Sequence, residues 1–175
     1  MELPRGIYLP LWTFDLGGRI DYVAEAVEEN TFPFQNGQPK RSRVNGSYPV
    51  QANDIPIPAS RKPSAIFLRL VRHFDLEAAK PYDSRYLAGW PAEVYDISLA
   101  EASLDARAQT LSRYKDKELE SLPSVQLISR SSAKMSVECF RLILLPVWIT
   151  EIPFNGREHL LLINGQNGRI ASDLW

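Results

Sequence analysis

The chain has 175 residues, of which 45% are hydrophobic and 23% charged, and its formal net charge is -1. This length suits a single domain, which can bury about two-thirds of its unfolded surface. A charge so close to zero argues against a dedicated nucleic-acid or membrane-surface binder, because both need a large basic field.

The single cysteine, Cys139, excludes an intrachain disulfide and a zinc site built from several thiolates. It lies in the apolar run Val137–Val147, so we expect it to be buried in the core. The cysteine content fits a reducing, cytoplasmic location. The longest apolar stretch, Leu142–Ile149, is far shorter than the ~20 residues that cross a bilayer, so we expect no membrane span in this chain.

The N-terminal part predicts a β-hairpin followed by a long loop. Ile7–Asp15 is rich in aromatic and branched residues, as strands are. Leu16–Arg19, with two glycines, is predicted to be a turn, and Ile20–Glu28 its hairpin partner. Residues 30–61 hold five prolines and two glycines, which predicts a Pro/Gly-rich loop or arm with one short strand inside it.

The middle of the chain predicts two helices. Pro63–Phe74 has apolar side chains at helical spacing. Ser98–Leu122 begins with a capping box, in which Ser98 accepts a bond from a first-turn amide and Glu101 reaches back. An aromatic connector and a short strand over 92–97 are expected between them.

The C-terminal residues, Val125–Trp175, predict an antiparallel β-meander. An Asn-Gly step at Asn155-Gly156, the strongest short hairpin signal, separates two apolar strands. Its strands are expected over 125–130, 135–152, 158–163 and 169–172, with further turns at Ser131–Lys134 and at Asn164–Gly168. We therefore predict a single α+β domain over 1–175, in which an antiparallel sheet with a C-terminal meander is packed by one long helix and a shorter helix.

Catalytic and metal-binding patterns are absent from the sequence. The two histidines, His73 and His159, lie in different predicted elements, and no nucleophile elbow, phosphate-binding loop, calcium loop or zinc-protease motif is present. We therefore expect no catalytic residue, no metal ligand and no cofactor, and we do not expect an enzyme.

Two sets of residues are candidates for binding. Tyr82, Tyr86 and Trp90 in the aromatic connector 82–90 could form a platform for a ligand, although packing in the core is the alternative for such aromatics.

The second set is basic. Lys40, Arg41 and Arg43 lie close together in the predicted loop and could meet phosphates. The alternative is an ordinary solvated loop, since three cations in a neutral protein make no large field.

Four segments together resemble a bacterial domain that is often found after a transcription-factor-type zinc ribbon, in proteins loosely described as primosomal or helicase-like. They are Tyr8–Asp15 (YLPLWTFD), Pro58-Ala59-Ser60, Tyr86–Ala102 and Leu144–Ile170. Two positions depart from that pattern: Asn167 stands for a threonine and Arg157 for a lysine. The resemblance brings no activity with it. It implies a neighbouring zinc ribbon or membrane segment, and hence a larger multidomain or membrane-anchored protein.

These observations lead to three expectations about function. We favour a non-enzymatic interaction or scaffold domain with a protein partner, while nucleic acid is a disfavoured partner and the oligomeric state is left open. The alternative is a ligand- or nucleic-acid-binding module that uses the aromatic connector 82–90 and the basic loop 40–43. A hydrolase with an unrecognised site is the third.

Overall fold

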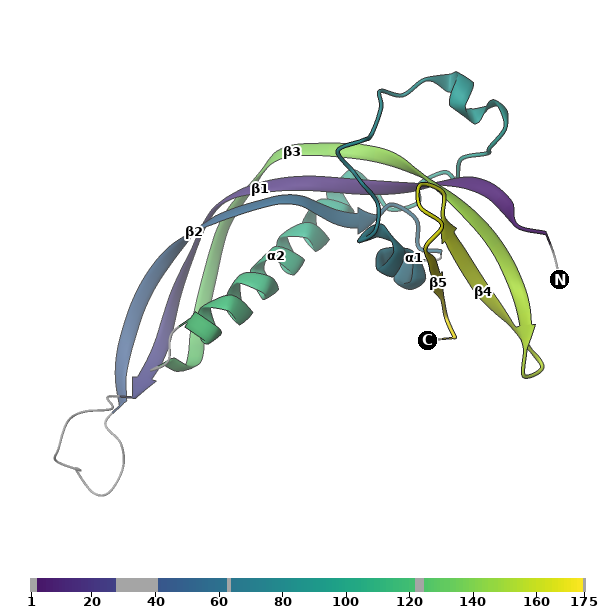
Figure 1. Ribbon diagram of the computed structural model, residues 1–175. Coiled ribbons are helices and arrows are strands. Elements are labelled where there is room, and N and C mark those ends of the chain that lie inside the picture. Colours follow the sequence, from purple (N-terminus) through teal and green to yellow (C-terminus); the bar gives the residue numbers. More distant parts are fainter. Residues whose placement is uncertain (1–2, 28–40, 63, 122–124, 175) are drawn as a thin grey trace. The chain divides into compact units, whose positions relative to one another are not determined.

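The computed structural model describes residues 3–27, 41–62, 64–121 and 125–174 (Figure 1). Five strands form one antiparallel sheet in the order β2-β1-β3-β4-β5. The strands are β1 (Arg5–Val27), β2 (Arg41–Pro58), β3 (Val125–Phe154), β4 (Arg157–Asn164) and β5 (Ile170–Ser172). The helices are α1 (Ser64–Val71), α2 (Leu99–Ser121) and a short 3-10 helix, η1 (Ser84–Ala88).

The protein is mostly β, and the predicted α+β class is therefore wrong. Three of the strands are 23, 18 and 30 residues long, whereas the two α-helices hold 8 and 23 residues. The class was misjudged because much of the sheet comes from segments that were predicted to be turns or loop.

The chain divides into two compact units. The strands β1, β2 and β3 and the helix α2 contribute residues to both units. Unit 1 comprises Met1–Thr13, Pro56–Ser103 and Phe140–Trp175, and unit 2 comprises Phe14–Ile55 and Leu104–Cys139.

The core of unit 1 lies between α1 and one face of the sheet. The helix packs on β4 and β5. Alternate residues of β1 and β3 point into this core, as the two-residue repeat of a strand requires. The buried members are Leu9, Leu11, Phe67, Leu70, Val71, Phe74, Ile143, Leu145, Val147, Leu162 and Ala171.

The β3–β4 hairpin turns where the sequence predicted it. Phe154 pairs with Arg157, and Asn155 and Gly156 between them have φ angles of 49° and 74°. These positive angles match a two-residue hairpin loop, for which Asn-Gly is the preferred pair. β4 then pairs antiparallel with β5.

Two other predicted turns are wrong, because β1 and β3 continue through these segments without interruption. The turns were expected at Leu16–Arg19 and at Ser131–Lys134, yet both segments are strand and lie side by side in unit 2. A Cβ on Gly18 would meet the carbonyl oxygen of Lys134 at 2.1 Å. The glycine therefore lets two strands approach closely and does not reverse the chain.

Much of the predicted loop 30–61 is also strand. β2 occupies Arg41–Pro58, and residues 28–40 lie outside the described part of the chain. In unit 2, α2 lies against the strands (Figure 1), and Tyr114 of α2 stacks on Tyr48 of β2 with ring centroids 5.8 Å apart. The Tyr114 hydroxyl also donates a hydrogen bond of 2.8 Å to the carbonyl oxygen of Gln51.

The predicted helix bounds were close to the observed ones. Ser98 Oγ accepts a hydrogen bond from the Glu101 amide at 3.2 Å, as a capping serine does. The Glu101 carboxylate binds Arg61 rather than reaching back to the amide of Ser98.

The prediction that Cys139 is buried was wrong. Cys139 is exposed, and the buried core residues of β3 begin only at Ile143. In the described residues, no helix combines the length and hydropathy that a membrane crossing requires.

Gly18→Ala should lower the free energy of unfolding by about 1–3 kcal/mol. Gly18 has a φ of +149°, which side chains rarely adopt, and the new Cβ would press on the β3 backbone. Urea denaturation would measure the loss. Gly89→Ala is the matched control, since nothing lies within 4 Å of its Cβ position and its φ is -114°. Equal stabilities of the two variants would contradict the close approach.

Candidate functional site

In unit 1, the face of β3 opposite α1 is also apolar. We call it the outer face. Leu144 and Pro146 are half-buried there, while Leu142 and Trp148 are 41% and 38% exposed. On the neighbouring strand β1, Tyr8 lies on the same outer face. Both odd- and even-numbered positions of β3 are apolar here, and they point to opposite faces of the sheet. Both faces therefore need to be covered in this region.

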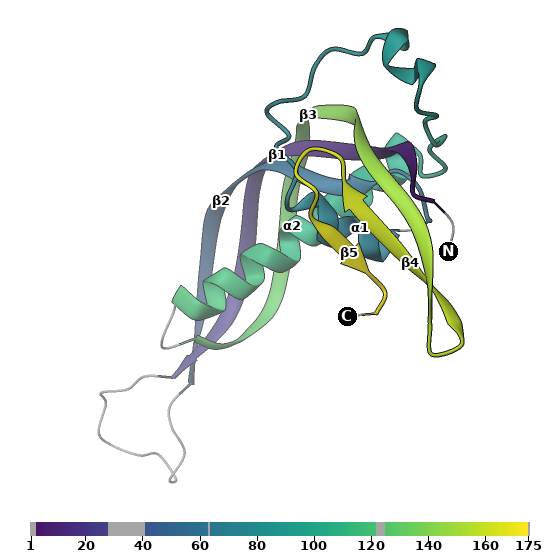
Figure 2. The ribbon, with the colours of Figure 1, turned by 45° about the vertical axis from the view of Figure 1, so that its right-hand side comes forward.

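Residues 75–97, which we call the strap, cover the outer face. Figures 1 and 2 show the strap rising from the end of α1, passing over β3 and β1, and returning to the sheet after η1. Where it returns, the Tyr8 amide donates to the Pro91 carbonyl and the Glu93 amide donates to the Tyr8 carbonyl, each at 2.9 Å. This short parallel bridge fixes the descending part of the strap to β1.

A cavity of about 570 Å³ lies between the strap and the outer face. Ligand pockets in proteins typically hold about 300–1,000 Å³ and are mostly apolar. The floor is formed by β3 and the roof by the strap, which contributes two tyrosines. The lining residues are Tyr8, Asp75, Leu76, Ala78, Ala79, Lys80, Pro81, Tyr82, Tyr86, Leu87, Arg141, Leu142, Ile143, Leu144, Leu145, Pro146 and Gln166.

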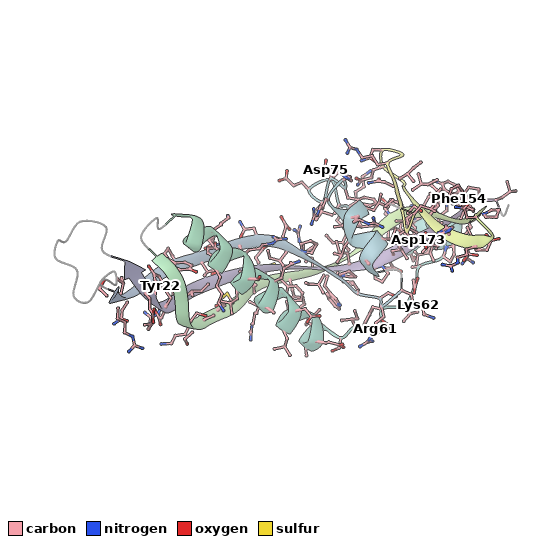
Figure 3. All side chains as sticks on the ribbon, turned by 90° about the horizontal axis from the view of Figure 1, so that it is seen from below. Tyr22, Arg61, Lys62, Asp75, Phe154 and Asp173 are labelled. Carbon is pink, nitrogen blue, oxygen red and sulfur yellow. The ribbon has the colours of Figure 1, made fainter. Side chains whose placement is uncertain are left out.

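The turn between β4 and β5 holds the beginning of the strap. Gln166 binds the backbone of Asp75 in both directions, accepting from its amide at 2.9 Å and donating to its carbonyl at 3.2 Å. Asn164 and Asn167 both donate to the carbonyl of His73, at 3.2 and 2.7 Å. Figure 3 places Asp75 beside this turn. The turn Asn164–Asn167 therefore holds the beginning of the strap by hydrogen bonds to the backbone of His73 and Asp75.

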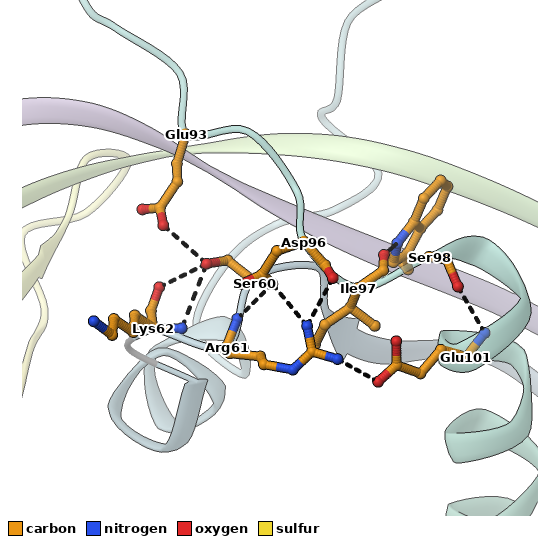
Figure 4. A network of polar contacts seen from close by, with 9 residues as sticks. Ser60, Arg61, Lys62, Glu93, Asp96, Ile97, Ser98 and Glu101 are labelled. Atoms are coloured by element: carbon orange, nitrogen blue, oxygen red, sulfur yellow. Dashed lines mark hydrogen bonds and ion pairs between the residues drawn. The ribbon is translucent and has the colours of Figure 1, made fainter.

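A polar network anchors the other end of the strap (Figure 4). Ser60 Oγ donates to Glu93 Oε1 at 2.9 Å. The Arg61 amide donates to Asp96 Oδ1 at 2.9 Å, and the Arg61 guanidinium donates to the Asp96 carbonyl at 2.7 Å and to Glu101 Oε1 at 2.6 Å. These bonds link the strap, the end of β2 and the first turn of α2. Both ends of the strap are therefore held by hydrogen bonds to other parts of unit 1.

Within the strap, an ion pair stabilises η1. Asp83 Oδ2 lies 2.6 Å from Arg85 Nη2, and Asp83 Oδ1 also accepts from the Arg85 amide at 2.9 Å, as an N-cap residue does. Hydrogen bonds from the Arg85 side chain, and then from its amide, lower the pKa of Asp83 below its ordinary value of 3.8. The same pair raises the pKa of Arg85.

The aromatic residues predicted as binding candidates have two different positions. Tyr82 and Tyr86 line the cavity and are 70% and 51% exposed, so the core alternative is wrong for both. Trp90 lies beside the cavity, between Tyr8 and Trp148, with ring centroids 5.7 and 4.7 Å away. It helps to close the strap onto the outer face.

Of the three basic candidates, only the side chain of Arg43 lies within the described part of the chain. Lys40 lies outside the described residues, and Arg41 is in β2 but its side chain is not described. Arg43 is exposed on β2 and belongs to unit 2, whereas every residue that lines the cavity belongs to unit 1.

Sequence reasoning missed the floor of the cavity and its charged residues. Leu142, Leu144 and Pro146 were noticed only as members of an apolar run within a predicted strand. A signal was present, since a strand that is apolar at both odd and even positions must be covered on both faces. Lys80 and Arg141 had no recognisable pattern around them.

Each of the two histidines contacts a charged side chain. His159 Nδ1 lies 3.3 Å from Asp173 Oδ1, and His73 Nδ1 lies 3.2 Å from Arg169 Nη1. Within residues 3–27, 41–62, 64–121 and 125–174, no group of three or more His, Cys, Asp or Glu side chains is arranged to hold a metal ion.

The chain is similar to a Bacillus subtilis protein, "Uncharacterized protein YdjG", with 25% identity over 173 residues. The similarity covers 95% of this chain and 50% of that protein, so the chain spans about half the length of this relative. No protein-family model matches the chain. No solved structure matches it either.

Asn164→Ala should release the beginning of the strap and lower the free energy of unfolding by about 1–3 kcal/mol. Asn164 is only 1% exposed, and its Oδ1 also accepts from the Gln166 amide at 2.7 Å, so the change leaves buried polar groups unpaired. Hydrogen exchange of the Asp75 amide should become faster. Asn45→Ala, at an exposed position on β2, is the control. An unchanged Asp75 exchange rate would show that the turn does not hold the strap.

The Asp83 carboxyl should titrate with a midpoint below 3.8, measured by NMR. A lowered pKa means that the ion pair stabilises η1 fully above the ordinary aspartate range and is lost as the pH falls through that midpoint. Arg85→Gln should move the midpoint back toward 3.8 because it removes the cation. A midpoint that does not respond to this substitution would contradict the assigned cause.

Proposed function

We propose that this chain is a non-enzymatic binding module, and that the cavity under the strap holds a small, mostly apolar ligand. The observation that carries the proposal is the cavity of about 570 Å³ between the strap and the apolar outer face. Its floor offers leucine and proline side chains, and its roof offers Tyr82 and Tyr86. Such a lining binds apolar surface through the hydrophobic effect, at about 25 cal/mol for each Å² removed from water.

The anchored strap supports the same proposal. A ligand that enters a preformed site does not have to order a loop, so less of its binding free energy is lost. The hydrogen bonds at Asp75 and at Arg61 hold both ends of the strap without a ligand. The tyrosines on the roof have rigid rings, which add contact area at a small cost in conformational entropy.

A protein partner is the second candidate, because exposed apolar residues continue along β3 beyond the cavity. Phe140 and Trp148 are 50% and 38% exposed at its two ends, and Tyr95 on the strap is 49% exposed. Aromatic residues of this kind are enriched in protein interfaces. On this proposal the module would work in the cytoplasm, within a larger protein, where the exposed Cys139 would stay reduced.

The double substitution Leu142→Gln and Leu144→Gln should weaken the binding of the neutral apolar dye Nile red by about tenfold or more. Both side chains lie on the cavity floor, and glutamine replaces apolar surface by an amide that must lose its water. Fluorescence titration would give the dissociation constants.

Leu104→Gln is the matched control, because Leu104 is 63% exposed on α2 and does not line the cavity. The control should bind the dye like the unmodified chain. Dye binding that is absent in the unmodified chain, or equal in all three proteins, would refute the cavity as the binding site.

A further inference from the structure

We propose that the ligand of this cavity is an uncharged molecule with a linear hydrocarbon chain, which lies extended along β3 beneath the strap. This proposal rests on the proposed function, since it names the class of ligand for the same cavity. It is carried by the direction in which the cavity runs and by the balance of the charged groups in its lining.

The cavity is elongated along one strand. Its lining includes all six residues of β3 from 141 to 146, whereas each side contributes a single residue: Tyr8 of the neighbouring strand β1, and Gln166 of the turn that follows β4. Neighbouring strands lie only about 4.8 Å apart, so a site that follows one strand is long and narrow. This shape suits an extended chain better than a compact ring system.

The floor is an apolar row on the outer face. Leu142, Leu144 and Pro146 occupy alternate positions of β3, and alternate side chains of a strand point to the same face. Four residue steps, at about 3.3 Å each, place the ends of this row about 13 Å apart. The row is most open at Leu142, which is 41% exposed, whereas Leu144 and Pro146 are half-buried. A chain can therefore enter at Leu142 and lie along the row.

The charged groups of the lining favour neither an anion nor a cation. Lys80 and Asp75 both line the cavity, and their formal charges cancel. Arg141 also borders the cavity, but it alternates in phase with Ile143 and Leu145 of the core, so its side chain points to the opposite face of the sheet. A charged ligand would lose hydration here without gaining an uncompensated partner of opposite charge.

Two polar side chains of the lining already have partners within the chain. Asp75 Oδ1 accepts from the amides of Glu77 and Ala78 at 3.1 and 3.3 Å. The side-chain amide of Gln166 accepts from the Asp75 amide at 2.9 Å and donates to the Asp75 carbonyl at 3.2 Å. Groups that are satisfied in this way offer little to a polar ligand. Apolar contact is therefore the main source of affinity.

Decanol is the probe, and three other compounds each differ from it in one property. Decanoate is an anion with a linear chain, decyltrimethylammonium is a cation with a linear chain, and adamantanol is a neutral alcohol whose carbon atoms form a compact cage. Each is titrated against the full chain by calorimetry, below any critical micelle concentration. The affinities of the two alcohols are divided by their water–octanol partition coefficients, so that the remaining difference reports the fit to the cavity.

We expect the corrected affinity of decanol to exceed that of adamantanol by about fivefold or more, because the chain contacts more of the floor. Neither ion should bind more tightly than decanol at low salt, and ionic strength should change none of the affinities strongly. Equal corrected affinities of the two alcohols would overturn the linear shape. An ion that binds more tightly than decanol would overturn the uncharged ligand.

Two variants test the balance of charge directly. Lys80→Gln should shift the ratio of the two ionic affinities toward the cation by about twofold to threefold, and Asp75→Asn should shift it toward the anion by a similar factor. Both should leave decanol binding unchanged. Arg157→Gln, which removes an exposed cation of unit 1 outside the cavity, is the matched control and should leave the ratio as it is.

A ratio that is the same in all these variants would refute the role of Lys80 and Asp75. If none of the four compounds binds, the proposed function itself fails. Binding of all four without the expected preferences would leave the proposed function intact and overturn only the class of ligand.

Discussion

The structure of unit 1 depends on one constraint: between Arg141 and Trp148, β3 is apolar on both of its faces. Ile143, Leu145 and Val147 belong to the core beneath α1. Leu142, Leu144 and Pro146 face the strap and line the cavity. A strand with this composition is unfavourable in water on either side, so each face needs its own cover. Helix α1 covers one face by direct packing, and the strap covers the other face at a distance that leaves the cavity between them.

An irregular segment that covers an apolar surface needs hydrogen-bond partners for its backbone amides and carbonyls. The strap finds such partners at both of its ends. The backbone of Tyr8 donates one hydrogen bond to the descending part of the strap and accepts another from it. The side-chain amide of Gln166 accepts from and donates to the backbone of Asp75 in the ascending part. The side chains of Asp75 and Asp83 each cap a turn of the strap itself. Both ends of this long loop are thereby tied to the rest of unit 1 by hydrogen bonds.

The sequence predicted the parts of the fold that short-range chemistry determines. The Asn155-Gly156 turn follows from the positive φ angles that this pair tolerates, and the start of α2 follows from the capping role of Ser98. Strand length was not predictable in this way. Globular strands usually run 3–10 residues, so a 23-residue strand with Gly17-Gly18 inside it was divided into a hairpin. Only the neighbouring strand, which passes against Gly18, explains why the glycine is there.

The cavity was predictable to a smaller extent. The aromatic connector contributed Tyr82 and Tyr86, because tyrosines concentrated in an irregular segment are a local signal. The floor on β3 could have been inferred, because apolar residues occupy both odd- and even-numbered positions of this strand. The charged residues could not, since Lys80 and Arg141 are 61 positions apart and only the path of the strap brings both to one cavity. The Asn164–Asn167 turn was recognised as a turn, but its partner, the His73 carbonyl, is set by tertiary structure.

The hydrogen bonds that hold the beginning of the strap also have a consequence for biosynthesis. Asn164 and the His73 carbonyl are separated by 91 positions, and Asn167 and the same carbonyl by 94. A chain that leaves the ribosome from its N-terminus therefore exposes the whole strap before the residues that fasten it have been made. The network at Arg61 and Glu101 is complete much earlier. The beginning of the strap is thus fastened only after Asn164 and Asn167 have been made, and a nascent chain interrupted before Asn164 lacks the side chains that tie the strap to the turn between β4 and β5.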